Sequence, residues 1–299
     1  MQQNERPAGY RFGFLMTFLG GCLWGFSGAC SQYLFTREGL TSDWLVAWRL
    51  IIAGAIMVGI LLLRQGRQAF AIWRTPRHAR MLVIFGLLGM SGCQYTYLSA
   101  IQHSNAGTAT VLQYLGPALI MVYLCIRTRR KPCPLEIFVL ILDLIGIFLI
   151  ATHGSVHSLA LSKEALAWGL LSAVFVAVYT LSPLELLGKY DSFAVVGWGM
   201  LIGGAAMMLW KHPWTRQVHV SPMGLVYIGC VIVFGSIIAF TLYVSGVSRI
   251  GPSKGSLVSS IEPVSAALFV VFWLGVQLTP LDIVGFGCII LTIILLALR

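Results

Sequence analysis

The sequence contains very few charged residues for its length. Only 10% of its 299 residues are Asp, Glu, Lys or Arg, and only ten residues are acidic. A soluble globular domain carries about 25% charged residues. Together with 58% hydrophobic residues and a mean hydropathy of +0.86, this scarcity of charge excludes a soluble domain and indicates a membrane protein.

The sequence also lacks long polar segments between its hydrophobic runs. The longest connection, 64–80, has no room for a soluble catalytic or nucleotide-binding domain, and no P-loop motif is present. The first run is Gly-rich and long, so it predicts a span rather than a cleavable signal. A bilayer core about 30 Å thick requires about 20 apolar residues per helix. We therefore predict an all-α integral membrane protein with ten transmembrane helices, at approximately 12–35, 43–63, 81–102, 105–126, 135–152, 164–186, 192–210, 222–247, 252–275 and 280–298.

Basic residues are concentrated in alternate connections. The clusters 64–80 and 127–131 hold most of the arginines outside the spans, and both connections fall on the same side as the two termini. The positive-inside rule then places both termini in the cytoplasm. The basic residues behind the net charge of +10 therefore set the topology, and they also contact the surface of the lipid bilayer. No nucleic-acid partner is expected. The predicted location is the cytoplasmic (inner) membrane of a bacterium, as a multi-pass protein.

Residues that bind metals or form disulfides are poorly placed for either role. The seven cysteines are odd in number and lie mostly inside apolar spans, where they act as small hydrophobic residues. All six histidines lie in connections or at span ends. This distribution argues against a mid-membrane histidine proton relay and against a metal site. No metal and no cofactor are expected.

An internal repeat divides the chain into two halves. The segment "WRLIIAGAIM" at 48–57 resembles "WGMLIGGAAM" at 198–207, with identical Trp, Ile, Gly, Ala and Met residues at matching positions. Five spans per half is an odd number, so the second half must enter the membrane from the opposite side. We predict two inverted five-helix repeats, 1–151 and 152–299, that form one transmembrane domain. A second alignment without gaps pairs Gly89, Tyr97, Ser99 and Pro117 with Gly235, Tyr243, Ser245 and Pro263.

Three charged residues lie well inside the predicted spans: Arg49, Asp143 and Glu262. A charge at the bilayer centre costs about 2.5–3.5 kcal/mol, so each is expected to face a cavity or a partner. Glu262 precedes Pro263, which removes a helix hydrogen bond, and it can handle substrate or protons, or it can be a neutral structural residue at the kink. Arg49 and Asp143 can be structural, or they can act as proton or charge partners.

Polar and aromatic residues at helical spacing suggest a pocket in mid-membrane. Ser259 and Ser260 lie next to Glu262, and the second alignment pairs them with Gln113 and Tyr114. Aromatic rings with a few polar groups are typical of pockets for small organic molecules, although ordinary packing also uses such rings. The predicted substrate-binding residues are Trp24, Gln94, Tyr97, Gln113, Tyr114, Tyr179, Tyr243, Ser259, Ser260 and Glu262, and the predicted hinges are Pro117 and Pro263.

The whole chain resembles the drug/metabolite transporter superfamily, in its EamA-type ten-helix branch. The similarity is carried by "GPSKGSLVSSIEPVSAALFVVFWLG" at 251–275, "LWGFSGACSQY" at 23–33, "AWRLIIAG" at 47–54 and "SNAGTATVLQYLGP" at 104–117. The resemblance implies that Trp24, Arg49, Glu262 and Pro263 occupy family motif positions. Many members have Leu-Gly-Glu at the end of the span corresponding to 252–275, whereas Gly275 is followed here by Val276 and Gln277. Family members move amino acids, other metabolites and drugs, so the fold does not select a substrate.

The functional prediction is a secondary transporter, an exporter of small organic metabolites such as amino acids or drug-like compounds. It would work by alternating access around a central mid-membrane site. A passive channel or facilitator for small solutes is the alternative, and an intramembrane enzyme is disfavoured because no nucleophile, base or metal ligands cluster in mid-span. The expected partners are a small-molecule substrate and lipid, with the protein as a monomer or weak homodimer.

Overall fold

The computed structural model describes residues 8–103, 106–155, 162–216, 218–274 and 279–298. Every regular element in these ranges is a helix. The α-helices are α1 (Ala8–Arg37), α2 (Ser42–Gln65), α3 (Pro76–Ile84), α4 (Cys93–Gln102), α5 (Ala106–Gln113), α6 (Gly116–Thr128), α7 (Pro134–Thr152), α8 (Lys163–Leu181), α9 (Leu184–Leu187), α10 (Ser192–Lys211), α11 (Pro222–Ile232), α12 (Ala239–Ile250), α13 (Pro252–Val258), α14 (Ile261–Leu274) and α15 (Pro280–Leu298). The remaining elements are the 3₁₀ helices η1 (Gly66–Arg74) and η4 (Pro213–Thr215) and the π-helical segments η2 (Phe85–Gly92) and η5 (Val233–Ile238).

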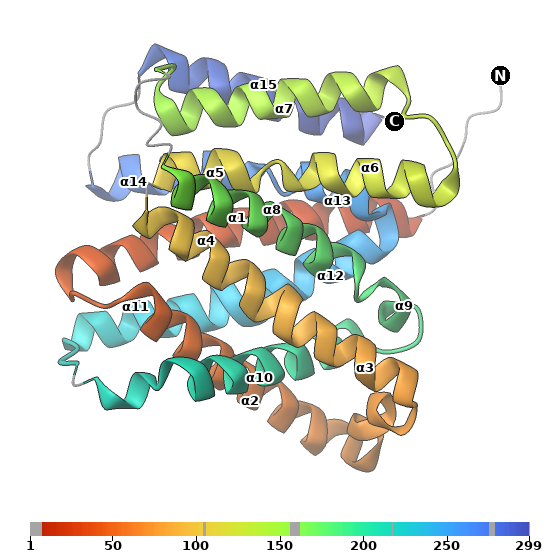
Figure 1. Ribbon diagram of the computed structural model, residues 1–299, viewed down its shortest axis with the longest axis vertical. Helices are drawn as coiled ribbons and strands as arrows, with labels where there is room; N and C mark the ends of the chain where they lie inside the picture. The colour runs from red at the N-terminus through yellow and green to blue at the C-terminus, as the bar shows by residue number, and fades with distance from the viewer. Residues whose placement is uncertain (1–7, 104–105, 156–161, 217, 275–278, 299) are drawn as a thin grey trace.

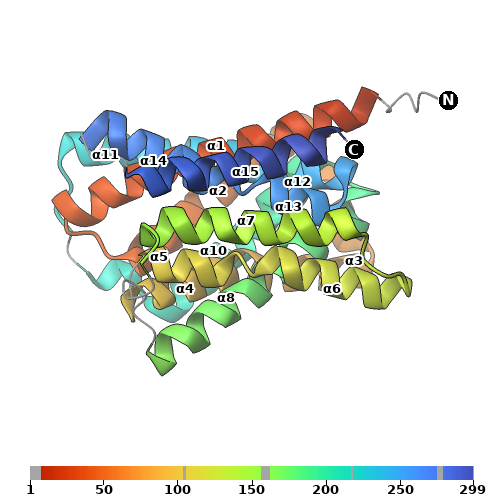
Figure 2. The same ribbon diagram turned by 90° about the horizontal axis from the view of Figure 1, so that it is seen from above.

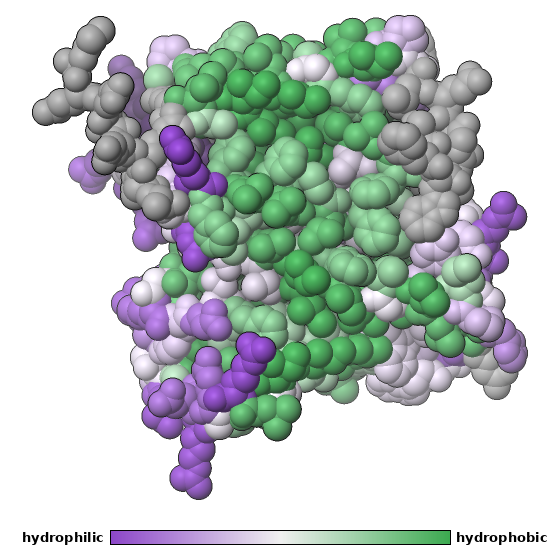
Figure 3. All heavy atoms as spheres, turned by 180° about the vertical axis from the view of Figure 1, so that it is seen from behind, coloured by the Kyte–Doolittle hydropathy of each residue, from purple (hydrophilic) through white to green (hydrophobic). Residues whose placement is uncertain are grey.

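Nine helical segments of the described chain are long and apolar enough to cross a membrane. They match the predicted spans except for 252–275, which corresponds to α13 and α14 and ends outside the described residues. Figure 3 shows a broad hydrophobic band between two hydrophilic ends, as expected for a surface that faces lipid. The protein is therefore an all-helical integral membrane protein, and a tenth crossing stays a prediction.

The helices pack in pairs that relate the two halves of the chain. α2 lies against α10 at one edge of the molecule, and α7 lies against α15 at the opposite edge (Figure 1). Between these edges, α1 packs against α12 and α14, while α8 packs against α4 and α5. The division into two inverted repeats stays a prediction.

The two ends of the described chain lie at the same end of the bundle (Figures 1 and 2). Tyr10 near the start of α1 donates a hydrogen bond of 3.4 Å to the carbonyl oxygen of Leu296 near the end of α15. The connection from α1 to α2 lies at the opposite end (Figure 1). This end, which contains residues 38–41, is called the distal end below.

Both halves contain a π-helical segment followed by an interrupted helix. The segments η2 and η5 contain Gly89 and Gly235, which the second sequence alignment pairs with each other. The helix breaks fall at 114–115, between α5 and α6, and at 259–260, between α13 and α14. Each break precedes a proline by a few residues, because a proline ring clashes with the carbonyl group four residues earlier. The predicted hinge positions Pro117 and Pro263 thus lie just after the breaks, and hinge motion itself stays a prediction.

Small residues allow α1 to approach the second break closely. A Cβ atom on Gly25 would overlap the Oγ of Ser265 and lie 2.6 Å from the backbone nitrogen of Ala266. Only glycine permits this distance between helices. The close approach holds the beginning of α14 against the middle of α1.

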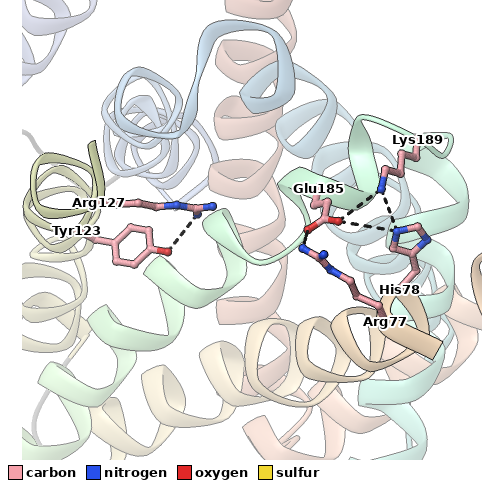
Figure 4. A network of polar contacts seen from close by, with 6 residues as sticks. All are labelled: Arg77, His78, Tyr123, Arg127, Glu185 and Lys189. Atoms are coloured by element: carbon pink, nitrogen blue, oxygen red, sulfur yellow. Dashed lines mark hydrogen bonds and ion pairs between the residues drawn. The ribbon is translucent and has the colours of Figure 1, made fainter. Parts of the chain in front are cut away.

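A polar network joins the start of α3 to the segment after α8 (Figure 4), at the end of the bundle that holds the chain termini (Figure 1). Arg77 donates a hydrogen bond of 2.8 Å to Glu185, and Lys189 lies 3.4 Å from the same carboxylate. His78 contacts Lys189 at 3.1 Å and the hydroxyl group of Tyr190 at 2.8 Å. This network is called the proximal clasp below.

A second network occupies the corresponding place at the distal end. The carboxylate of Glu38 accepts hydrogen bonds from the hydroxyl group and the backbone N–H of Ser221, the residue before α11. These two donors hold the pKa of Glu38 below its ordinary value of 4.5. The contact, called the distal clasp below, joins the α1–α2 connection to the start of α11.

Candidate functional site

A cavity of about 720 Å³ lies between the halves of the molecule. Its lining comes from α1, α2, η2, α4, α5, α6, α8, α12, α13 and α14 and from both helix breaks. The predicted site residues that line it are Trp24, Arg49, Gln94, Tyr97, Gln113, Tyr114, Pro117, Tyr179, Tyr243, Ser259 and Glu262. Ser260, Pro263 and Asp143 are not among the lining residues. The tertiary structure thus brings most of the predicted residues together, and their role in substrate binding stays a prediction.

The cavity occupies only one part of the depth of the bundle. The lining residues of α1 run from Trp24 to Phe35, and none comes from the first half of this helix. The lining continues through Leu40 and Thr41 in the distal connection and through Ser42 at the start of α2. Thr41 is exposed to solvent. The cavity therefore extends from the middle of the protein to the distal end.

Four aromatic rings close together occupy the inner part of the cavity. The Trp24 ring lies 4.9 Å from the rings of both Phe240 and Tyr243, and Tyr179 stacks on Tyr243 at 5.5 Å. The hydroxyl groups of Tyr243 and Thr180 are 3.0 Å apart and join α12 to α8. These rings are called the aromatic cluster below, and edge and stacked ring contacts of this kind stabilise a packed wall.

Glu262 is the second residue of α14 and faces the cavity. Its Oε2 accepts a hydrogen bond of 3.2 Å from the hydroxyl group of Tyr114, which lies at the first helix break. The N-terminal end of a helix favours a nearby negative charge, because its free backbone N–H groups carry a partial positive charge. The break before Ile261 therefore creates a local environment suited to a carboxylate in mid-membrane.

Arg49 supplies the opposite charge in the same cavity. Its Nε donates to the Oγ of Ser236 at 3.1 Å, and its Nη2 donates to the carbonyl oxygen of Gly235 at 3.3 Å. Both partners belong to the π-helical segment η5, whose altered hydrogen-bond pattern makes a carbonyl group available. A guanidinium group has five N–H donors, so these two bonds leave others for a ligand. Arg49 and Glu262 do not form a direct ion pair in the described structure.

Three polar atoms of the lining residues have no partner among the described residues. They are Nε1 of Trp24, Nε2 of Gln94 and the hydroxyl group of Tyr179, and all three are buried. Buried polar groups in native proteins nearly always have hydrogen-bond partners. These three donors are therefore available to a polar molecule in the cavity.

Asp143 and Ser260 lie outside the cavity and contact each other. Ser260 Oγ donates a hydrogen bond of 2.7 Å to Asp143 Oδ2, and both side chains are fully buried. The expectation that Ser260 shares the cavity-facing surface of Ser259 is wrong in this structure. The helix is interrupted at these two residues, so they do not follow regular helical spacing. Pro263 is likewise absent from the lining.

Several lining residues did not stand out in the sequence. Phe240 belongs to the aromatic cluster, and Cys93 and Thr110 also line the cavity. Phe240 lies three residues before Tyr243, a spacing that places both on one helix face. The others are small residues that are common in packed membrane helices. Their place in the lining depends on the interruptions in neighbouring helices.

Comparison with known proteins places this architecture in a family. The model of the EamA-like transporter family matches residues 11–152 and 163–298. The chain belongs to the EamA-like transporter family. This confirms the resemblance to the drug/metabolite transporter superfamily, and it makes the protein a transporter of that type in the bacterial inner membrane.

Individual relatives cover most of the chain. An uncharacterized inner membrane transporter, YicL, from Salmonella typhimurium is 36% identical over 96% of both chains. The threonine/homoserine exporter RhtA from Escherichia coli (strain K12) is 26% identical over 74% of this chain and 73% of its own. A crystal structure has a TM-score of 0.80 at 18% identity and covers 96% of both chains, which shows a shared fold.

Proposed function

We propose that the protein is a secondary transporter that exports small zwitterionic organic metabolites, amino acids among them. The observation that carries this proposal is the presence of Arg49 and Glu262 on the walls of one cavity. A guanidinium group binds carboxylates well, and a carboxylate binds ammonium groups. A molecule with both charges would satisfy both side chains, which are costly to leave unpaired in the membrane.

The three buried donors support the same substrate class. Trp24, Gln94 and Tyr179 offer N–H and O–H groups, which complement the oxygen atoms of a carboxylate. The aromatic cluster next to them provides an apolar wall for a side chain. The relative RhtA, named as an exporter of threonine and homoserine, is consistent with a substrate of this size and charge.

The shape of the cavity supports a carrier in preference to a passive channel. The lining reaches the distal end, whereas the opposite half of α1 contributes no lining residue. With the termini in the cytoplasm, as the distribution of arginines predicts, this conformation faces outward. Alternating access would then require the rings of the aromatic cluster to move apart, so that the cavity opens toward the cytoplasm. The proposal assigns no catalytic residue.

The first test is thermal stabilisation of the purified protein by a panel of amino acids, amines, carboxylic acids and nucleosides. A ligand that binds only the folded state raises its apparent stability. We expect amino acids to stabilise the protein more than the matching amines or carboxylic acids, each of which carries only one charge. Equal stabilisation by a one-charge analogue would contradict the zwitterion proposal.

The second test is counterflow in proteoliposomes with a radiolabelled amino acid that gives stabilisation. A carrier shows saturation and is accelerated by unlabelled substrate on the other side of the membrane. Flux that is linear with concentration and shows no counterflow would favour a channel. Glu185→Gln, which removes a carboxylate in the proximal clasp, is a matched control for changes at Glu262.

A further inference from the structure

A buried carboxyl group lies behind the cavity and takes no part in the proposed substrate site. Asp143 in α7 has 0% of its surface exposed. Its Oδ2 accepts the hydrogen bond from Ser260, whereas its Oδ1 is buried and has no partner among the described residues. A carboxylate ion with a single hydrogen bond is very costly to bury in apolar surroundings. This geometry fits a carboxylic acid that carries a proton.

The neighbouring elements supply no compensating positive charge. The helices α5, α14 and α15 pack against α7, and α1, α6 and α13 contribute residues to the apolar cluster around Val139 and Leu140. The titratable side chains on α14 and α15 are Glu262, Asp282 and Cys288, and Tyr114 follows α5. The cations of the other three helices are engaged elsewhere: Arg11 is exposed, Arg127 donates to Tyr123, and Lys254 donates to Tyr10. Among the described residues none of these groups forms an ion pair with Asp143, so none of them stabilises its ionised form.

The only hydrogen-bond partner of Asp143 among the described residues lies at a mechanically important position. Ser260 belongs to the break between α13 and α14, where its own backbone N–H bonds to the carbonyl oxygen of Leu257 at 3.2 Å. Two residues later, Glu262 faces the cavity and donates its backbone N–H to Ser259 at 2.9 Å. A movement of Ser260 is therefore transmitted directly to the backbone that carries Glu262.

We propose that Asp143 is an exchangeable proton site and that its protonation state controls the break between α13 and α14. When the O–H bond of Asp143 breaks, the electron pair stays on the carboxylate and the proton passes to a water molecule. The resulting ion attracts water and further donors, so the apolar contact between α7 and the break becomes unfavourable. Ser260 then moves with the carboxylate, and Glu262 moves with Ser260.

The consequence for transport rests on the proposed function. The structure combines a cavity that reaches the distal end with an Asp143 geometry that suits the protonated acid. With the distal end outside the cell, the proton binds in the outward-facing state and leaves in the inward-facing state. The substrate moves in the other direction, so the protein is a proton antiporter.

Infrared difference spectroscopy between alkaline and acidic pH tests the proton site without any substrate. We expect the C=O stretching band of a buried carboxylic acid in the natural protein and loss of one component in Asp143→Asn. Ser260→Ala should keep this component and shift its frequency, because the hydrogen bond is lost. Glu136→Gln, which removes an ion-paired carboxylate at the start of the same helix, should leave it unchanged.

Two spectroscopic results would overturn the proposal. One is that the natural protein shows no pH-dependent C=O band that is lost in Asp143→Asn. The other is a Ser260→Ala variant with an unchanged frequency, which decides the question even where Asp143→Asn does not fold. An effect of sodium ions on the band at constant pH would instead assign the site to a metal cation and would also contradict the proposal.

Proteoliposomes loaded with L-threonine test the coupling. Outside acidification by one pH unit changes the attainable substrate concentration ratio about tenfold for each exchanged proton, and we expect faster efflux from the natural protein. Asp143→Asn should retain counterflow at equal pH and lose the response to the gradient. An unchanged response in Asp143→Asn would disprove coupling through this residue. Absence of L-threonine flux from the natural protein would count against this substrate, and the infrared titration would then decide the proton site.

Discussion

The two interrupted helices share a backbone design but differ in chemistry. Each break lies a few residues before a proline, and each follows a helix with a π-helical segment. In the alignment that pairs Pro117 with Pro263, Glu262 in the second half corresponds to Gly116 in the first. A Cβ atom on Gly116 would lie 2.9 Å from Cγ1 of Val176, whereas the Glu262 side chain extends into the cavity. The interruption thus occurs in both halves of the chain, whereas only the second half has a charged residue at the paired position.

The two breaks contribute different polar groups to one cavity. The first break contributes the hydroxyl group of Tyr114, and the second contributes the carboxylate that accepts its hydrogen bond. The second break is also joined to α7 through Ser260 and Asp143. Binding of one small molecule requires each polar group only once, so the two breaks can differ in their side chains.

The largest expected effect comes from neutralising the charge of the second break. Glu262→Gln keeps an oxygen that can accept the bond from Tyr114 but removes the charge. Hydrogen bonds to charged groups contribute about 1.5–3 kcal/mol, so amino acid binding should weaken roughly tenfold to a hundredfold. Binding is measured by thermal stabilisation and counterflow, with Glu185→Gln as the control. Unchanged affinity in a folded Glu262→Gln protein would contradict a direct role in binding.

The first break can be tested by introducing a side chain where the second has one. Gly116→Leu forces atoms into the space of Val176 and should destabilise the protein by about 2–3 kcal/mol through overpacking. A lower thermal unfolding temperature, measured in detergent without ligand, checks this. Gly59→Leu is the control, because nothing lies within 4 Å of a Cβ atom at that position. Equal effects of the two changes would show that close packing at Gly116 is not the cause.

Neighbouring serines at the second break should differ in their effect on stability. Ser260→Ala leaves Asp143 without a hydrogen-bond partner among the described residues, which should cost about 1–2 kcal/mol. Ser259 donates to the carbonyl oxygen of Ser256 in its own helix, and its loss leaves no buried carboxylate without a partner, so Ser259→Ala should cost less than about 1 kcal/mol. Thermal unfolding of both variants gives the comparison. A larger loss of stability in Ser259→Ala than in Ser260→Ala would contradict the stabilising role of the hydrogen bond between Ser260 and Asp143.

The contact between the breaks should make a smaller contribution. Tyr114→Phe removes the hydroxyl group that donates to Glu262 and keeps the aromatic ring. We expect a loss of about 1 kcal/mol, or roughly fivefold in affinity for an amino acid that stabilises the protein. Tyr10→Phe, which removes a hydroxyl group far from the cavity, is the control in the same binding measurement.

The smallest effect is expected at the distal clasp. The pKa of Glu38 is lowered in the folded protein, so its contribution to stability is present above the unfolded pKa and is lost as the pH falls through the folded pKa. The carboxylate is exposed, so the change in unfolding temperature should be slight. Thermal unfolding of Glu38→Gln should show a slightly weaker decline on acidification below the ordinary glutamate pKa. A steeper decline than in the natural protein would have the wrong sign.

Composition and spacing alone predict the membrane class and the helical segments, whereas the predicted repeat and the family resemblance rest on particular sequence segments such as 48–57 and 251–275. The first two features depend on the cost of placing polar groups in lipid, which acts on every segment of the sequence locally. Most of the predicted cavity residues were also found this way, because charged, polar and aromatic residues are rare inside spans and are conspicuous there. Arg49 and Glu262 are the clearest examples.

The partners of these residues follow only from tertiary structure. No local pattern connects Asp143 to Ser260 or Arg49 to the π-helical segment η5, because each pair is far apart in sequence. The interruption at 259–260 turns Ser260 away from the cavity, although helical spacing placed it beside Ser259. Helix packing decides which buried polar groups meet, since the hydrogen bonds they need can be formed only with groups that the fold brings within reach.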